Sequence, residues 1–359
     1  MRGYLVLADI SGYTRFLSES ELEHANGIIG ELLESILAAI DAPLEVSRIE
    51  GDAVFMYGTP PEGMIGETLL ETVEQLYLSF ARALETMVLN TTCSCNACVN
   101  INALGLKIVM HCGEFAVTKV GGIQTLSGTD VIVAHRLLKN RVREETGIDD
   151  YLFASEACVA DLGIGHIVSG WIPHDETYED VGAVGGYVTS LADAWNAAKA
   201  ESDHVVTEDQ AWLRSEVATT APPAVVWDHL LDARKRTAWL DAHRNEVVAD
   251  GTGRMGPGAE FHCVHGPENE VLVFTVLGRQ PLQHMTLSFP VGEGLAIRYT
   301  DHLVPSDGGT TVISCAAPVA STETGEPIDA ERLADYEPMF LGYVDSLNRM
   351  AEMVARVAG

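Results

Sequence analysis

The first half of the chain alternates short apolar runs with longer stretches in which apolar residues return every three to four positions. The runs predict strands and the repeats predict amphipathic helices. Gly51 permits a tight turn between two of the runs, which predicts a hairpin there. The order strand, helix, strand, strand, helix, strand predicts a ferredoxin-like βαββαβ domain. The predicted strands span residues 4–8, 44–49, 53–57, 104–111 and 115–120, and the predicted helices span 28–40, 69–88 and 131–140.

Beyond residue 210 the pattern changes to many short apolar runs, closed by one long helical repeat. The stretch 196–210 is rich in Ala, Lys, Glu and Asp and lacks apolar periodicity, so we expect a linker there. The fold class predicted for the whole chain is therefore α+β, with one domain over 1–195 and a second, antiparallel domain over 211–359. In this second half we expect strands at 211–219, 259–265, 270–278, 283–289, 295–304 and 310–317, and helices at 222–231 and 329–357.

The composition agrees with two globular domains and limits the classes of partner that we expect. The chain has 359 residues, of which 47% are hydrophobic and 21% charged, with a formal net charge of -30. A surface this acidic repels phosphate backbones and anionic membranes, so nucleic acid and membrane partners are not expected. Strong acidity is equally compatible with a salt-adapted or high-GC source organism. We see no signal peptide and no membrane helix, and we expect a cytoplasmic protein with reduced thiols.

Two aspartates occupy special positions in the predicted first domain. Asp9 ends the first strand, and Asp52 lies at the tip of the hairpin. In a ferredoxin-like sheet these elements are neighbours, so the two carboxylates can meet and hold hard cations through oxygen. Gly12 follows closely and lets backbone amides approach phosphate oxygens. The alternative is that Asp9 is a helix cap and Asp52 an ordinary turn residue.

Four segments around these residues resemble successive blocks of the class III adenylate and guanylate cyclases. They read ADISGYT (8–14), RIEGD (48–52), KIVMHCGE (107–114) and GTDVIVAHRL (128–137), and the resemblance covers about residues 1–195. It implies conversion of ATP to cyclic AMP in a homodimer, because cyclases of this class build their site between two such domains. The resemblance further implies two Mg²⁺ or Mn²⁺ ions held by Asp9, Asp52 and the carbonyl of Ile10, phosphates over Gly12, Tyr13 and Thr14, base selection by Arg48 and Thr125, and transition-state stabilisation by Arg136.

Two departures from the cyclase pattern bear on activity. Ile132 stands where the family has an asparagine that orients the ribose, and isoleucine can neither donate nor accept a hydrogen bond. The family's late phosphate-binding lysine has no counterpart in the matching block YEDVGAVGGY (178–187). Removing one transition-state donor typically costs about 10²–10³ in rate. Two functions therefore stay open: a weak metal-dependent cyclase, or a degenerate nucleotide- and metal-binding signalling module.

Three cysteines lie within six residues in the segment TCSCNAC (92–98). Thiolates at the spacing of Cys93, Cys95 and Cys98 can hold Zn²⁺ if a fourth ligand comes from elsewhere in the chain. The alternatives are a redox-sensitive loop and a cysteine-rich loop without metal. Ordinary cyclases lack this insert, whereas a group of uncharacterised bacterial cyclase-like proteins resembles the chain here.

The segment EVATTAPPAVVWDHLLD (216–232) resembles the opening of START-like (SRPBCC) proteins, and Arg234, Arg236 and Thr237 continue the likeness. The resemblance covers about 206–359 and implies a helix-grip fold with a cavity for a small apolar ligand that regulates the first domain. Core filling is the alternative for each candidate, and a catalytic second half regulated by the first is a weaker third option. The candidate cavity residues are Trp227, Trp239, Phe261, Phe274 and Tyr299.

Overall fold

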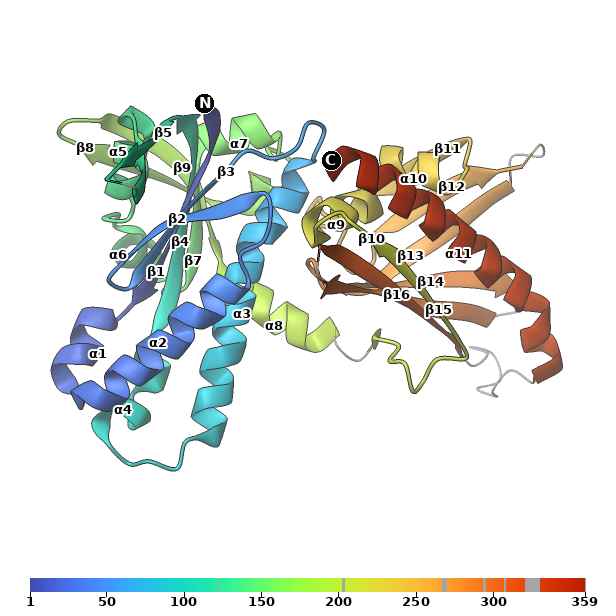
Figure 1. Ribbon diagram of the computed structural model, residues 1–359, viewed down its shortest axis with the longest axis horizontal. Helices are drawn as coiled ribbons and strands as arrows, with labels where there is room; N and C mark the ends of the chain where they lie inside the picture. The colour runs from blue at the N-terminus through green and yellow to red at the C-terminus, as the bar shows by residue number, and fades with distance from the viewer. Residues whose placement is uncertain are drawn as a thin grey trace. The chain divides into compact units, whose positions relative to one another are not determined.

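A computed structural model describes the protein over residues 1–121, 123–201, 204–266, 270–292, 295–306, 308–319 and 330–358. The chain forms two compact units, drawn in Figure 1. The first unit comprises 1–62 and 69–196, and the second comprises 63–68 and 197–359. Both units combine helices with a β-sheet, so the chain belongs to the α+β class, as predicted.

The first unit is built on a seven-stranded sheet with the strand order β2-β3-β1-β4-β7-β9-β8. β1 pairs antiparallel with β3 on one side and with β4 on the other. The segment β2-β3-β1-β4, with helices between β1 and β2 and between β3 and β4, has the split βαβ order that the sequence predicts. The strands are β1 (Arg2–Ser11), β2 (Leu44–Glu50), β3 (Ala53–Gly58), β4 (Gly105–Glu114), β7 (Tyr151–Ser155), β8 (Ile172–Tyr178) and β9 (Gly182–Ser190).

Helices cover this sheet and explain why β1 is apolar almost throughout. Leu5 and Leu7 of β1 pack against Val131 and Ala134 of α5, and residues between them point to the opposite face. α2 and α3 contact each other, since the Ser79 hydroxyl donates to the Ser35 carbonyl at 2.8 Å. The helices are α1 (Tyr13–Glu19), α2 (Leu22–Ala38), α3 (Gly66–Asn90), α4 (Asn96–Val99), α5 (Thr129–Leu137), α6 (Val142–Thr146), α7 (Glu156–Leu162) and α8 (Leu191–Glu201), with short 3-10 turns at Ile101–Ala103 and Val168–Gly170.

The sequence pattern missed several elements of the first unit. β5 (Ala116–Val120) and β6 (Ile123–Ser127) form a separate two-stranded sheet, although only the first was predicted. β7 pairs in parallel with β4 and carries β9 and β8 beyond it, which widens the sheet. β8 alternates in burial, but its buried residues His174 and Glu176 are polar, and β9 is interrupted by glycines, so neither produces a clear apolar strand signal.

The second unit is a seven-stranded antiparallel sheet with the order β10-β16-β15-β14-β13-β12-β11. Two short helices, α9 (Pro223–Leu231) and α10 (Ala233–Trp239), connect β10 to β11, and the long α11 (Ala330–Ala358) lies against the sheet (Figure 1). The sequence pattern missed only β11 and α10 here; β11 is a largely exposed edge strand. The strands are β10 (Leu213–Thr219), β11 (Arg244–Val248), β12 (Glu260–His265), β13 (Glu270–Gln280), β14 (His284–Gly292), β15 (Leu295–Ser306) and β16 (Gly309–Val319).

The predicted linker 196–210 differs from the observed chain in two ways. Its first residues continue α8 to Glu201, whereas Ser202 and Asp203 lie outside the described residues. Val206 is buried, and its backbone N–H donates to the Thr300 hydroxyl at 2.9 Å. Burial of Val206 and this hydrogen bond thus pack part of the segment onto β15. Asp329, where the last helix was predicted to begin, also lies outside the described residues.

No helix in the described part of the chain is long and apolar enough to cross a bilayer.

Candidate functional site

Strand pairing brings Asp9 and Asp52 together, as the hairpin argument predicts. Asp9 lies opposite Ala53 in the β1–β3 ladder, and Ala53 is the residue that follows Asp52. The backbone N–H of Ile10 donates to the carbonyl of Asp52 at 3.2 Å. Burial and the neighbouring charge of Asp9 raise the pKa of Asp52 to about 6. Two carboxylates this close favour binding of a cation, because its positive charge would reduce the repulsion between them.

Lys107 is a member of this site that sequence reasoning missed. It lies opposite Asp9 in the β1–β4 ladder, and its Nζ is 2.8 Å from Asp9 Oδ2. The same ammonium donates to the carbonyl of Leu138 at 3.1 Å. A single lysine within an otherwise apolar strand was the available signal. The site therefore holds two carboxylates and one ammonium.

This donor set fits a divalent cation, with a restriction. Carboxylate and carbonyl oxygens are the ligands that Mg²⁺ and Mn²⁺ prefer, and Asp9, Asp52 and the Ile10 carbonyl supply them. Lys107 already pairs with Asp9, so a cation at that carboxylate competes with the ammonium.

Gly12 shapes the turn that leads from β1 into α1. Its φ is 83°, and a Cβ at this position would come within 2.6 Å of the Ala103 carbonyl oxygen. Only glycine tolerates both conditions without strain. Tyr13 and Thr14 follow as the first residues of α1. A polar cavity of about 430 Å³ opens beside this turn, with Ser11, Gly12, Arg15, Asn102, Ala103 and Arg143 among its lining residues.

The cyclase resemblance assigns further residues to base selection, ribose orientation and transition-state stabilisation. These residues lie on β2, β6 and α5, and their interactions are with groups other than Asp9 and Asp52. Arg48 of β2 forms an ion pair with Glu50 and a hydrogen bond of 3.1 Å to His135 of α5. The side chain of Ile132, also on α5, is 53% exposed. The remaining two are Thr125, on β6 opposite Thr118, and Arg136, which lies 3.6 Å from Asp180.

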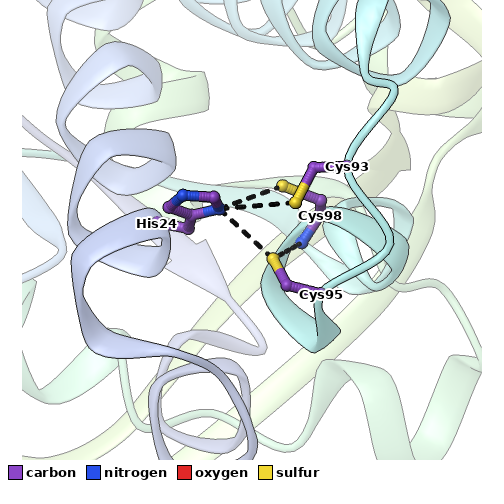
Figure 2. Close-up of side chains that lie close together, drawn as sticks. All are labelled: His24, Cys93, Cys95 and Cys98. Carbon is purple, nitrogen blue, oxygen red and sulfur yellow. Dashed lines mark hydrogen bonds between the residues drawn. The ribbon is translucent and has the colours of Figure 1, made fainter.

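His24 joins the three clustered cysteines, as Figure 2 shows. Its Nδ1 lies 3.3 Å from the sulfur of Cys95, 3.6 Å from that of Cys98 and 3.7 Å from that of Cys93. The four ligand atoms all lie within 4.8 Å of one another. Sequence reasoning missed His24 because it precedes the cysteines by about 70 residues and lies on a different helix, α2.

The second unit contains a cavity of about 340 Å³ between its sheet and α11. Phe274 and Tyr299 line it, as expected of them, together with Phe289 and Tyr343. The ring centroids of Phe274 and Phe289 lie 4.9 Å apart in a stacked arrangement, and those of Tyr299 and Tyr343 are also 4.9 Å apart. The lining is predominantly apolar, and its polar members are Asp241, His265, Ser346 and Arg349.

Trp227, Trp239 and Phe261 do not line this cavity, which corrects the expectation for them. All three have 0% exposure and lie in the core of the second unit. The guanidinium carbon of Arg236 lies 5.0 Å from the Trp239 ring centroid and 4.2 Å from that of Phe261. The rings of Trp239 and Phe261 therefore flank a buried cation, and Trp227 lies in the apolar core.

Comparison with curated proteins finds a relative in Mycobacterium tuberculosis, the uncharacterised protein Rv2561/Rv2562. The two are 30% identical over 166 residues, which is 46% of this chain and 74% of the relative. The chain belongs to the family of this mycobacterial protein. Residues 29–146 of this family member also match a family described as "Protein of unknown function (DUF2652)". The match runs from within α2 to the end of α6 and includes the three clustered cysteines but not His24.

Solved structures similar to this family member include adenylyl and guanylyl cyclases at low identity. A bacterial light-regulated adenylyl cyclase is 14% identical with a TM-score of 0.39, and the match covers 54% of this chain and 52% of that chain. The guanylyl cyclase Cya2 is 14% identical with a TM-score of 0.40 and coverage of 55% and 95%. Protein MLL2253 from Mesorhizobium loti is 16% identical with a TM-score of 0.32 and coverage of 40% and 96%.

Proposed function

We propose that the first unit is a weak, metal-dependent nucleotide cyclase that converts ATP to cyclic AMP as a homodimer. The observation that carries this proposal is the juxtaposition of Asp9 and Asp52 at the edge where β1 meets the β2–β3 hairpin. Two carboxylates beside a glycine turn are suited to hold a divalent cation together with a triphosphate.

The reaction assigned to this site is an in-line displacement at the α-phosphorus. The ribose 3′-oxygen forms a bond to that phosphorus, the bond to the pyrophosphate oxygen breaks, and the 3′-hydroxyl proton passes to solvent. When bound, a divalent cation would neutralise charge on the triphosphate and lower the pKa of the attacking hydroxyl. Asp9, Asp52 and the Ile10 carbonyl would hold it, and the turn at Gly12 would leave space for the phosphates.

The remaining roles require a second copy of the chain. Arg48, Thr125, Ile132 and Arg136 belong to β2, β6 and α5 and interact with groups other than Asp9 and Asp52. In the shared-site arrangement that the cyclase resemblance implies, these residues face the aspartates of the partner. Arg136 is about half exposed and pairs with the exposed Asp180 at 3.6 Å, so it could exchange that partner for a phosphate.

Two observations predict a low rate and favour a second candidate, a nucleotide-binding module without turnover. Ile132 offers no polar atom to the ribose, and Lys107 competes with a cation for Asp9. The two candidates differ in whether product forms, so one assay separates them.

The purified chain is incubated with ATP or GTP and Mn²⁺ or Mg²⁺, and cyclic product is measured by mass spectrometry. We expect slow product formation that is lost in Asp52→Ala and retained in the control Asp209→Ala, an exposed aspartate of the second unit. Nucleotide binding by a folded dimer without any product would establish the binding module. Product that persists in Asp52→Ala would refute both assignments of the site.

We further propose that the second unit is a START-like domain whose cavity binds a small apolar ligand and regulates the first unit. The aromatic lining and the volume of about 340 Å³ support this. Gly342 lines the cavity, and a Cβ there would meet nothing within 4 Å, so Gly342→Leu fills the space without backbone strain.

Gly30→Leu is the matched control, because Gly30 is also helical and also open at its Cβ. An environment-sensitive apolar dye should bind the wild type and Gly30→Leu but not Gly342→Leu. Equal dye binding by all three proteins would refute a ligand site in this cavity.

A further inference from the structure

The cluster of His24, Cys93, Cys95 and Cys98 has the composition and dimensions of a tetrahedral metal site. Bonds of about 2.3 Å to sulfur and about 2.0 Å to nitrogen, at tetrahedral angles, separate the nitrogen from each sulfur by about 3.5 Å. The observed separations from His24 Nδ1 are 3.3, 3.6 and 3.7 Å. One imidazole nitrogen thus stands at the correct distance from three sulfurs at once (Figure 2).

We propose that His24, Cys93, Cys95 and Cys98 bind one structural Zn²⁺ ion. Three thiolates and an imidazole in a tetrahedral arrangement select zinc over the hard cations that suit carboxylates. The four protein ligands complete the coordination, which leaves no position for water or substrate and makes the site structural. This inference is independent of the proposed cyclase function, because it involves neither Asp9 nor Asp52.

A redox-active disulfide explains the cluster less well. Such a bond needs two cysteines and leaves the third cysteine and His24 without a role. All seven cysteines are free thiols, and Cys93, Cys95 and Cys98 converge on the imidazole instead of pairing.

Local structure positions the four ligands from two distant segments. Cys95 caps α4, since its sulfur accepts the backbone N–H of Cys98 at 3.5 Å. The backbone N–H of Ala97 donates to Glu21 Oε2 at 3.1 Å, which fixes α4 beside the start of α2. Those contacts hold the cysteine loop close to the helix turn that carries His24.

Zinc at this place would clamp the connection between α3 and β4 onto α1 and α2. α4 contacts both helices, and its continuation through Asn102 and Ala103 forms one wall of the 430 Å³ cavity beside Gly12. α1 also lines this cavity, through Arg15 and Phe16. Zinc bound by His24 and the three cysteines would therefore fasten the segment that carries Asn102 and Ala103 to α2.

The test is metal analysis of the full-length chain after purification without added zinc or chelator. We expect about one zinc per chain by inductively coupled plasma mass spectrometry, released when the thiols are blocked with a mercurial. Reconstitution with Co²⁺ should produce the visible absorption of tetrahedral cobalt with thiolate ligands. Neither measurement on the wild type depends on a variant that folds.

Variants then assign the ligands. Cys98→Ser and His24→Ala should each weaken zinc binding by more than about 100-fold, because even outer-shell partners contribute 10- to 100-fold. Cys315→Ala, a buried cysteine of the second unit, and His166→Ala, an exposed histidine of the first, should retain full zinc. Asp52→Ala should also retain it, which separates this proposal from the cyclase assignment.

Three results would overturn the proposal. They are a zinc-free protein with three titratable thiols in the cluster, a disulfide within 93–98 found by peptide mapping of freshly purified protein, or wild-type zinc affinity in His24→Ala.

Discussion

Replacing Lys107 by methionine should strengthen divalent-cation binding at Asp9 and Asp52. The Lys107 ammonium lies 2.8 Å from Asp9 Oδ2 and 3.1 Å from the Leu138 carbonyl. A divalent cation on the same carboxylate would come within about 4 Å of this ammonium. At an effective dielectric constant of about 20, two unit charges at that distance interact by about 4 kcal/mol, and the cation carries two. The lysine must therefore leave Asp9 before the cation can bind.

The cost of that departure sets the size of the effect. Lys107 breaks two charge-assisted hydrogen bonds, each contributing about 1.5–3 kcal/mol in a buried setting. The Lys107 and Asp9 side chains are 23% and 18% exposed, so solvent replaces part of this energy and we take about 2 kcal/mol in total. Methionine keeps the length of the side chain and removes the charge. Because 1.4 kcal/mol corresponds to a factor of ten, Lys107→Met should bind Mn²⁺ about 30-fold more tightly.

Isothermal titration calorimetry with Mn²⁺ at pH 7.5 and constant ionic strength measures this difference directly. Lys107→Arg is the matched control, because it retains the positive charge and should retain the weak affinity of the wild type. Thermal melts show whether either variant has lost its fold. Unchanged or weaker Mn²⁺ binding by a folded Lys107→Met, or an equal gain in Lys107→Arg, would refute the assignment of this carboxylate pair as the cation site.

Three further predictions concern the ribose position, the core and the hydrogen-bonded carboxyl of Asp161. Ile132→Asn restores a polar side chain for the ribose and should raise the rate of cyclic product formation by about 10- to 100-fold in the mass-spectrometric assay; no gain would argue against this placement of the nucleotide. Leu347→Ala opens a cavity under α11 at a fully buried position and should lower the free energy of unfolding by about 2–5 kcal/mol in urea titrations, and a loss below about 1 kcal/mol would contradict the packing. Burial raises the pKa of Asp161, but hydrogen bonds from Tyr4 and Arg2 outweigh burial and hold that pKa below its usual value. Tyr4→Phe should therefore cost about 1–2 kcal/mol of stability above pH 5. That cost should shrink as the pH falls below about 4, because the carboxyl of Asp161 is then protonated first in the unfolded and next in the native protein. A loss of stability that does not depend on pH would contradict this coupling of the hydrogen bond to the ionised carboxyl.

Local periodicity predicted most of the elements because it depends on residues that are close in sequence. The apolar repeat of α2 places Ala25, Ile29, Leu32 and Ile36 on one buried stripe, and the strands of the second unit follow their apolar runs within a few residues. The prediction was wrong where the signal was weak. The edge strand β11 is mostly polar, and β9 is broken by glycines, so neither alternates clearly.

In each of the two candidate metal sites, some residues could be predicted from the sequence and others could not. Asp9 and Asp52 were foreseeable as neighbours, because the predicted ferredoxin-like topology places the first strand beside the hairpin. Lys107 and His24 were not, since each reaches its partners only through the pairing of β4 with β1 or the docking of α4 on α2.

The sequence by itself determined the order of the elements, the pairing of the two aspartates and the clustering of three thiols. Each of these follows from spacing along the chain or from the topology that the order of the elements predicts. Only the tertiary structure decided that an ammonium shares Asp9, that an imidazole completes the thiol cluster, and that Phe274 and Tyr299 face a cavity while Trp239 and Phe261 flank Arg236. These outcomes depend on which side chains meet across strands and helices that are remote in sequence, and the energies of such contacts leave no periodic trace in the chain.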